Sequence, residues 1–143
     1  MKKVGVLLSG CGFNDGAEIH ESVLTMLFLD KSGAEMILMA PNIDQMHVIN
    51  HYTGQEMEEY RNVLVESSRI ARGEIKDMAE VTGNDLDALI IPGGFGVAKN
   101  LSDYAMAGSD CSVNPDVYRL IAELRLMEKP IGAICIAPVM MAK

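Results

Sequence analysis

The sequence is short of positive charge and of long hydrophobic runs. It holds 12 lysines and arginines against 20 aspartates and glutamates, so its formal net charge is −8. An acidic surface repels phosphate backbones and anionic membrane surfaces, so we expect neither nucleic acid nor a membrane as a partner. No stretch approaches the roughly 18 apolar residues that a membrane-spanning helix needs. Apolar residues nevertheless make up 49% of the chain, which indicates a globular domain rather than a disordered segment.

Cysteine is also scarce. The chain has three, Cys11, Cys111 and Cys135, an odd number whose spacing matches no zinc-binding pattern. Unpaired thiols are typical of a reducing compartment. The apolar run Val4–Leu8 behind the first lysines is too short for the core of a signal peptide. We therefore expect a cytoplasmic protein with free thiols.

The histidines, His20, His47 and His51, do not indicate a metal site. His47 and His51 would share a face only on a helix, and the turn-forming residues around them favour a loop. We therefore expect no metal ion. A separate absence is that of a Walker A loop, because no glycine-rich turn ends in Gly-Lys-Ser/Thr.

Short apolar runs set the expected architecture. Four of them are expected to be strands: Val4–Leu8, Met36–Ala40, Leu86–Ile91 and Ile131–Cys135. Their continuous apolarity is typical of strands that are covered on both faces. Apolar residues at helical spacing predict helices over 17–31, 58–72 and 115–127.

This alternation predicts an α/β fold with a mostly parallel sheet and helices on both faces. We expect one domain over residues 1–143. A further helix would open at Pro138, and the sequence stops at Lys143. We therefore expect this domain to lack its C-terminal part.

The strongest candidate for chemistry is Cys135. It follows the last apolar run and precedes Pro138, which suits the start of a helix. Ala133 and Ala137 flank it, and small residues at those positions suit a nucleophile on a tight strand-to-helix turn. A helix N-terminus there would favour the thiolate. A buried structural cysteine at a strand end is the alternative.

A second candidate is the turn after the third apolar run, where Gly93, Gly94 and Gly96 follow Pro92. Glycine lets backbone N–H groups approach a ligand closely, and two such donors can stabilise a developing oxyanion. A simple tight turn is the alternative.

A third candidate is Glu18, which follows the glycine-rich loop over residues 9–17. A carboxyl group that faces the thiol could donate a hydrogen bond to sulfur or act as a general acid or base. Negative charge is also an ordinary feature of a first helical turn. Cys11 lies in the same loop, after a strand that could neighbour the strand of Cys135.

Three segments together resemble the ThiJ/PfpI family of the class I glutamine amidotransferase-like superfamily: Glu18 after its loop, Leu89–Gly94 and Ala133–Pro138. More closely, the chain is similar to the ElbB group, also called enhancing-lycopene-biosynthesis or sigma cross-reacting proteins. The stretches that support this closer match run through nearly the whole chain: Ser9–Gly12, Glu18–Glu21, Val48–Gly54, Arg61–Glu66, Ala71–Ile75 and Ala98–Ser102.

The resemblance implies a flavodoxin-like three-layer sandwich, a homodimer and no cofactor. It implies a nucleophilic cysteine paired with an acidic residue, and backbone N–H groups that bind an anion. Some relatives convert methylglyoxal or glyoxal into a hydroxy acid, so a small aldehyde is the expected ligand. The implied catalytic residues are Cys135 and Glu18; the implied anion-binding residues are Gly93, Gly94 and Ile136; further candidates for lining the site are Cys11, Gly12 and Asn14.

Two functions of different classes are compatible with these residues. The first is a glyoxalase III-type lyase in which Cys135 adds to the aldehyde and Glu18 moves protons. The second is a non-enzymatic, redox-responsive or regulatory protein of isoprenoid metabolism, because a thiol at a helix N-terminus oxidises readily. Glutamine amidotransfer ranks last, because Ile136 stands where peptidase and amidotransferase relatives often carry a histidine.

Overall fold

A five-stranded parallel sheet forms the centre of the computed structural model, which describes residues 1–143. Its strands run in the order β5-β2-β1-β6-β7, and every neighbouring pair is parallel. The strands are β1 (Lys3–Leu7), β2 (Glu35–Ala40), β5 (Lys76–Asp77), β6 (Ala88–Ile91) and β7 (Ile131–Ala133). A separate antiparallel hairpin pairs β3 (Val48–Ile49) with β4 (Glu56–Met57).

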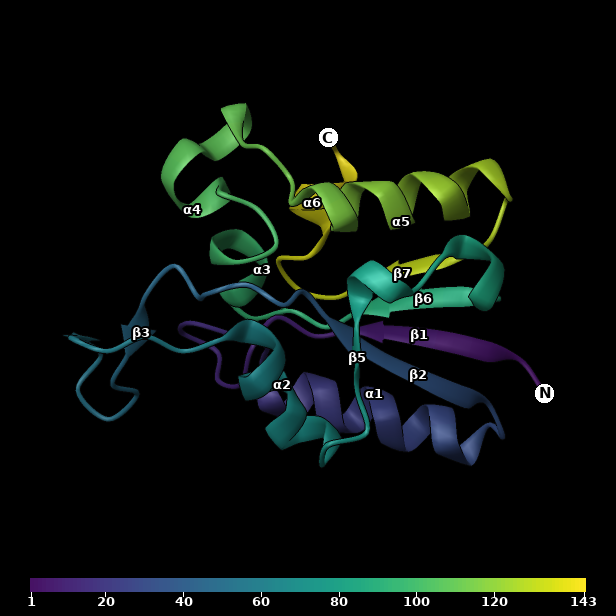
Figure 1. Cartoon of the computed structure of the whole chain (residues 1–143), viewed down its shortest axis with the longest axis horizontal. Coiled ribbons are helices and arrows are strands. Elements are labelled where there is room, and N and C mark those ends of the chain that lie inside the picture. Colours follow the sequence, from purple (N-terminus) through teal and green to yellow (C-terminus); the bar gives the residue numbers. More distant parts are fainter.

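Helices cover both faces of this sheet (Figure 1). On one face lie α1 (Ile19–Lys31) and α2 (Val63–Ala71), and on the other lies α5 (Pro115–Leu126). The shorter helices are α3 (Gly96–Lys99), α4 (Tyr104–Ala107), α6 (Pro138–Met141) and the 3-10 helices η1 (Met78–Glu80), η2 (Gly83–Asp85) and η3 (Gly108–Asp110). The expected α/β, flavodoxin-like sandwich with a parallel sheet is confirmed.

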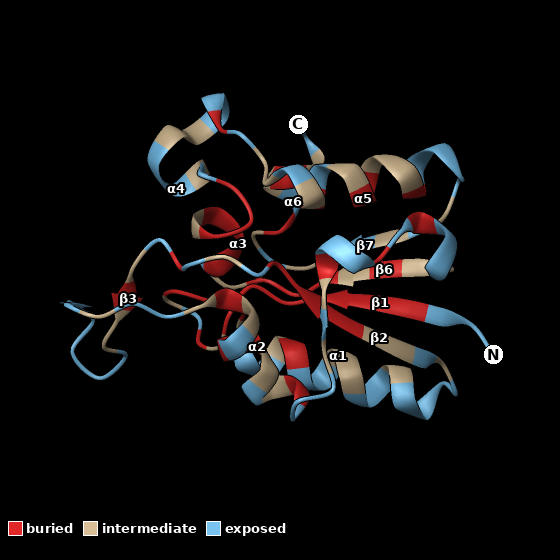
Figure 2. Ribbon diagram, viewed as in Figure 1, coloured by how far each residue is buried: buried red, intermediate tan, exposed pale blue.

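The alternation of side chains along β1 explains why its apolar run is continuous. Val6 and Leu8 enter the core under α1 and α2, whereas Leu7 enters the larger core under α5. Successive residues of a strand point to opposite faces, so a strand covered on both sides needs apolar residues at every position. Figure 2 shows that the buried residues concentrate in the central strands and in α3.

The four expected strands and three expected helices are all present, and they differ from the expected ranges by a few residues at most of their ends. Two features did not emerge from the sequence. β5 has only two residues, and the irregular stretch expected over 41–60 contains the β3–β4 hairpin. This hairpin, residues 44–62, projects from the body as an arm whose base is closed by a bridge between Asp44 and Asn62.

The order of the strands changes direction at β1. From β1 the chain moves outward through β2 to β5, and it then returns to the other side of β1 to form β6 and β7. Ligands of such sheets bind outside the carboxyl ends of the strands at this switch point. The loops that leave β1 and β6 meet there, since the Phe95 N–H donates to the Phe13 carbonyl at 2.7 Å and the Gly96 N–H to the Gly16 carbonyl at 2.9 Å.

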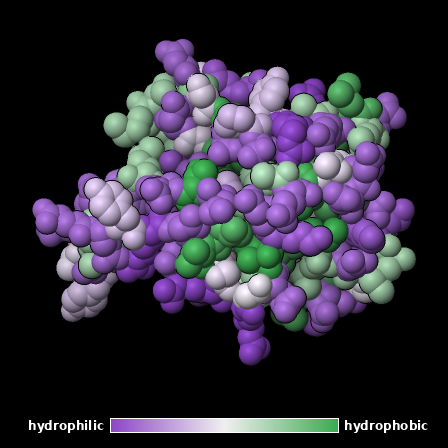
Figure 3. All heavy atoms as spheres, viewed as in Figure 1, coloured by the Kyte–Doolittle hydropathy of each residue, from purple (hydrophilic) through white to green (hydrophobic).

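Most of the face seen in Figure 3 is hydrophilic, including much of the hairpin arm, and a patch of hydrophobic residues lies near its centre. None of the helices has the length and apolarity that crossing a membrane requires.

Candidate functional site

Cys135 lies at the turn between β7 and α6, and its side chain is exposed. Its φ angle is +58°, a left-handed conformation that costs a non-glycine residue about 1–3 kcal/mol and is concentrated at functional sites. Ala137, on the α6 side of the turn, is fully buried in the core under α5, so the turn has no room for a larger side chain there. The structure therefore holds this cysteine on a sharp turn and presents it to solvent.

Cys135 opens into a pocket of about 300 Å³ at the switch point. Its lining comes from the loop after β1, the start of α1, the glycine turn after β6 and the Cys135 turn. The lining residues are Phe13, Glu18, Glu21, Gly94, Phe95, Cys135 and Ile136. Four of the residues singled out in the sequence are thus brought together: Glu18, Gly94, Cys135 and Ile136.

Glu18 is the N-cap of α1. One carboxylate oxygen accepts a hydrogen bond from the Glu21 N–H at 2.5 Å, and the other lies 3.0 Å from Nδ1 of His20. Burial raises the pKa of Glu18, but the hydrogen bonds from Glu21 and His20 outweigh it, so the pKa lies below the usual range. Glu18 is therefore an ionised cap, which does not suit the expected protonated donor to sulfur.

Glu21 is the acidic residue that the structure places against the Cys135 turn. Its Oε1 accepts a hydrogen bond from the Gly93 N–H at 2.9 Å. A side-chain carbon added to Gly93 would lie 2.6 Å from that oxygen and 2.7 Å from Cβ of Cys135, so both groups flank the same point. The sequence carried one signal for Glu21: it lies three residues after Glu18, on the same face of the helix.

Two backbone donors of the pocket have no acceptor within the protein. The N–H groups of Gly94 and Ile136 make no hydrogen bond, whereas the N–H of Gly93 is used by Glu21. Gly94 has a φ of +100°, and a Cβ there would overlap the backbone of Gly16 and Glu18. The donors expected at Gly94 and Ile136 are thus open to a ligand, and the one expected at Gly93 is not.

Cys11, Gly12 and Asn14 do not line this pocket. Gly10 and Gly12, with φ angles of +120° and +129°, bend the loop after β1 back on itself. The Gly16 N–H donates to the Gly12 carbonyl at 2.7 Å and closes the bend. Only Phe13 of this bend lines the Cys135 pocket. Gly12 and Asn14 contact His51 on the hairpin arm instead.

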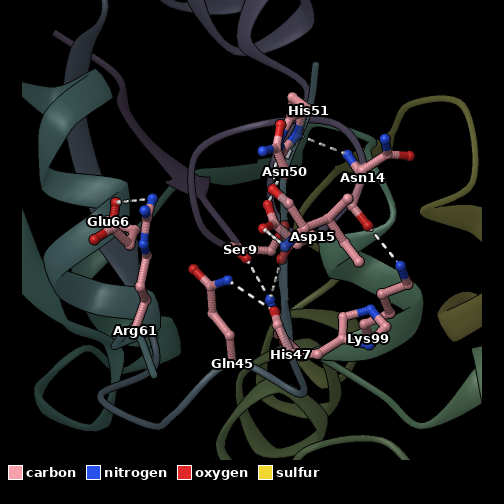
Figure 4. Close-up of polar contacts among 12 residues, drawn as sticks. Ser9, Asn14, Asp15, Gln45, His47, Asn50, His51, Arg61, Glu66 and Lys99 are labelled. Atoms are coloured by element: carbon pink, nitrogen blue, oxygen red, sulfur yellow. Dashed lines mark hydrogen bonds and ion pairs between the residues drawn. The ribbon is translucent and has the colours of Figure 1, made fainter. Parts of the chain in front are cut away.

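These contacts belong to a polar cluster that we call the hairpin anchor: Asn14, Asp15, His51, Lys99 and Asn100. Asp15 is buried, and one of its oxygens accepts from the Ile49 N–H at 2.8 Å. Nε2 of His51 accepts from the Asn14 N–H at 3.2 Å, so Nδ1 carries the proton and donates to the Ile49 carbonyl. Lys99 donates to the Asn14 carbonyl at 2.6 Å. Figure 4 shows Asn14, Asp15, His51 and Lys99 gathered between the loop and the arm.

Asn100 completes the anchor from the end of α3. Its amide nitrogen donates to the carbonyls of Ser9 and Asp15, both at 2.8 Å, and its oxygen accepts from the Met46 N–H at 2.9 Å. One buried side chain therefore ties the loop after β1 to the hairpin arm.

Cys11 lies apart from Cys135. It follows β1, and β6 separates β1 from β7, so the two cysteines do not follow neighbouring strands as expected. Burial raises the pKa of the Cys11 thiol, and the carboxylate of Glu66 raises it further against the opposing charge of Arg69. Cys11 is therefore held as a protonated thiol, and it is half-buried.

Two curated proteins are similar to the chain over nearly its whole length. The human protein named glutamine amidotransferase-like class 1 domain-containing protein 3, mitochondrial, is 53% identical over 99% of the chain. The rat ES1 protein homolog, mitochondrial, is 51% identical over 99% of the chain. This similarity makes the chain a homologue of these two proteins. It spans about half the length, 53%, of these curated relatives.

Solved structures are also similar to the chain. The crystal structure of an isoprenoid biosynthesis protein with an amidotransferase-like domain from Ehrlichia chaffeensis is 41% identical, with a TM-score of 0.93 over 98% of this chain and 66% of its own. A DJ-1/ThiJ/PfpI-like and ferritin-like two-domain protein from Anabaena variabilis, at 18% identity and a TM-score of 0.60 over 99% of this chain and 31% of its own, shares the fold. No protein-family model matches the chain.

The expected cytoplasmic location is wrong by the same comparison. The human, rat and zebrafish relatives are all named as mitochondrial proteins. Free thiols persist in any reducing compartment, so the cysteine content did not distinguish the cytoplasm from a mitochondrion.

Proposed function

We propose that the chain is an ElbB-like protein and that it converts methylglyoxal or glyoxal into a hydroxy acid without a cofactor. The observation that carries this proposal is the exposed Cys135 at a positive φ angle, facing a pocket that Glu21 and two unpartnered N–H groups also line. Similarity to a solved structure described as an isoprenoid biosynthesis protein supports the ElbB-like assignment. The names of the curated relatives support a mitochondrial location.

The reaction proceeds by covalent catalysis. The Cys135 thiolate adds to the aldehyde carbon of methylglyoxal, and the oxygen takes up a proton to give a hemithioacetal. The proton on that carbon then moves to the neighbouring carbonyl carbon through an enediol, which oxidises the aldehyde carbon to a thioester and reduces the ketone to an alcohol. Water hydrolyses the thioester, which releases lactate and restores the thiol. The redox change is internal to the substrate.

Glu21 is the residue that moves the proton. One of its oxygens is oriented by Gly93, and the other has no hydrogen-bond partner. Glu18 has both oxygens engaged in the helix cap, so its part is to fix the first turn of α1. The N–H groups of Gly94 and Ile136 stabilise the oxyanion of the hemithioacetal and enediol.

Lactate production from methylglyoxal by the purified protein tests this function. Cys135→Ser should lower kcat/KM by about 1000-fold or more, because the nucleophile is lost. Cys11→Ser, outside the pocket, should retain activity. Glu21→Gln should lower kcat by about 100-fold, the usual value of a general acid or base, and Glu18→Gln by less. Equal rates for Cys135→Ser and the wild type would refute the proposal.

A redox-responsive protein is the second candidate, and one observation favours it. Cys135 is exposed, whereas Cys11 is half-buried and Cys111 is buried. Mild peroxide followed by mass spectrometry should find sulfenic or sulfinic acid on Cys135 alone. Equal oxidation of the three cysteines would count against this role.

The proposed ligand is a small aldehyde and the proposed assembly a homodimer. Helix α1 exposes Val23, Leu24, Leu27 and Phe28, and two of them, Leu24 and Phe28, line a groove beside Ile90 and Ile134. A second copy would cover these apolar residues.

A further inference from the structure

Two phenyl rings line the Cys135 pocket, and no step of the proposed reaction uses them. Phe13 is 49% exposed and Phe95 is 44% exposed, and their backbones are joined by a hydrogen bond. His51 meets the Phe13 ring edge-on, with centroids 5.5 Å apart and planes at 78°. The ammonium group of Lys99 lies 5.5 Å from the centre of the Phe95 ring. Both rings are therefore supported from the hairpin anchor and keep a free surface.

The charges that line the pocket are all negative or neutral. Its ionisable side chains are Glu18, Glu21 and Cys135, and no lysine, arginine or histidine lines it. The ammonium group of Lys99 donates to the Asn14 carbonyl at 2.6 Å. A bound carboxylate would therefore face two carboxylates and no cationic side chain in the lining; His20, which is 3.0 Å from a Glu18 oxygen, lies outside it.

We infer that the Cys135 pocket selects uncharged carbonyl compounds with a flat apolar substituent and rejects carboxylates, and that Phe13 and Phe95 determine this specificity. The two rings offer aromatic surface to the substituent, while Glu18 and Glu21 repel negative charge. The inference rests on the proposed function only in requiring that Cys135 is an accessible nucleophile. It specifies which small carbonyl compounds the site accepts.

Charge selection is measured by alkylation of Cys135 with iodoacetamide and with iodoacetate, followed by mass spectrometry of the Cys135 peptide. In both reactions the thiolate displaces iodide, and the reagents differ chiefly in charge. The rate ratio of amide to acetate should exceed that of glutathione by about tenfold, since a unit charge a few ångströms away changes the energy by an amount of this order. The double variant Glu18→Gln, Glu21→Gln should bring the ratio back towards that of glutathione.

The overall charge of −8 also repels iodoacetate, so a matched control is needed. The double variant Glu58→Gln, Glu80→Gln removes two exposed carboxylates outside the Cys135 pocket, as many as the pocket variant removes, and should leave the ratio unchanged. Glutamine keeps an oxygen acceptor for the N–H groups of Glu21 and Gly93, so the fold of the double variant is preserved. A ratio that responds equally to both changes would overturn the local charge selection.

Aromatic selection is measured with N-phenylmaleimide and N-methylmaleimide, to which the thiolate adds across the carbon–carbon double bond. Relative to glutathione, Cys135 should prefer the phenyl reagent by about fivefold, the size of one good aromatic contact. Phe13→Leu and Phe95→Leu should reduce that preference, whereas Tyr118→Leu, which changes an exposed aromatic residue of α5 outside the pocket, should not. Preferences that match glutathione in both assays would overturn the inference and leave the proposed function standing. A Cys135 no more reactive than the buried Cys111 would overturn both.

Discussion

The Cys135 pocket and the hairpin anchor lie at the same edge of the sheet and share the loop after β1, yet they use their polar groups in opposite ways. In the anchor, Asp15 and Asn100 are buried, and Asn100 satisfies three backbone groups. In the pocket, Cys135 is exposed at a positive φ angle and the N–H of Gly94 has no partner. One region pairs its buried side chains with backbone groups, and the other leaves backbone donors open.

This difference indicates how one short loop provides both stability and reactivity. Buried polar groups contribute to stability when they are paired and are costly when they are not. A site that must bind a ligand has to leave donors unpaired and can hold a strained residue only where the surroundings fix it. The anchor fixes the Phe13 and Phe95 rings that line the pocket, because His51 and Lys99 contact them. The strained Cys135 turn is held from β6, where the Ile134 N–H donates to the Ile91 carbonyl at 3.0 Å.

The largest effect is expected from Gly94→Ala, which tests how closely the loop after β6 must approach α1. The added methyl group would overlap the backbone of Gly16 and Glu18 and would occupy a φ of +100°. We expect a loss of roughly 4 kcal/mol in the free energy of unfolding, from strain and overpacking together. Chemical denaturation measures it.

Gly54→Ala is the matched control for this change. Gly54 has a φ of +77° but no atom within 4 Å of an added Cβ, so only the conformational cost of roughly 1 kcal/mol applies. Equal losses for the two variants would show that backbone strain, and not the close approach, decides the position of the pocket.

The next largest effect is expected from Asn100→Ala, which breaks the anchor. It leaves two buried carbonyls, those of Ser9 and Asp15, and the part-buried N–H of Met46 without their partner. We expect a loss of about 3 kcal/mol, at about 1 kcal/mol or more for each unsatisfied group. Asn84→Ala, at an exposed position on η2, should change stability by less than about 0.5 kcal/mol.

Asn100→Ala also tests the dependence of the pocket on the anchor. The rate of Cys135 alkylation should change in Asn100→Ala under native conditions, because the loop that carries Phe13 loses its attachment. A variant that is destabilised but alkylates Cys135 at the wild-type rate would show that the two regions are independent.

The sequence predicted the sheet better than the loops, because consecutive residues of a covered strand carry a recognisable pattern. The runs at β1 and β2 are apolar at nearly every position because both of their faces are covered, and that pattern is visible without a structure. β5 has two residues and pairs only at Lys76 and Asp77, too short for any pattern. The hairpin arm is likewise formed by two-residue strands.

Only part of the candidate site could be predicted, again the part that depends on neighbouring residues in the sequence. Cys135 could be singled out from Ala133 and Ala137, because the constraint of a tight turn acts on adjacent residues. Where Cys11 points depends on the path of the loop through Gly10 and Gly12, which spacing alone does not give. Glu18 and Glu21 both stand at the start of α1, and only the hydrogen bond from Gly93 distinguishes their roles.

The smallest effect is expected from Glu18→Gln, which sharpens the distinction between the cap and the pocket. The pKa of Glu18 is lowered in the folded state, since the hydrogen bonds from Glu21 and His20 outweigh the effect of burial. A carboxyl group with a lowered folded pKa stabilises the fold above its unfolded pKa of about 4.3, and this contribution is lost as the pH falls through the folded value. The wild type should therefore exceed Glu18→Gln by about 0.5 kcal/mol near pH 5, the usual value of a negative charge at a helix N-terminus, and the gap should narrow below pH ~4. Urea denaturation at a series of pH values measures this, with Glu58→Gln on the hairpin arm expected to show no such gap. A gap that stays constant down to pH ~2 would mean that the charge of Glu18 does not stabilise α1, and the distinction between Glu18 and Glu21 would then rest on the hydrogen bond from Gly93 alone.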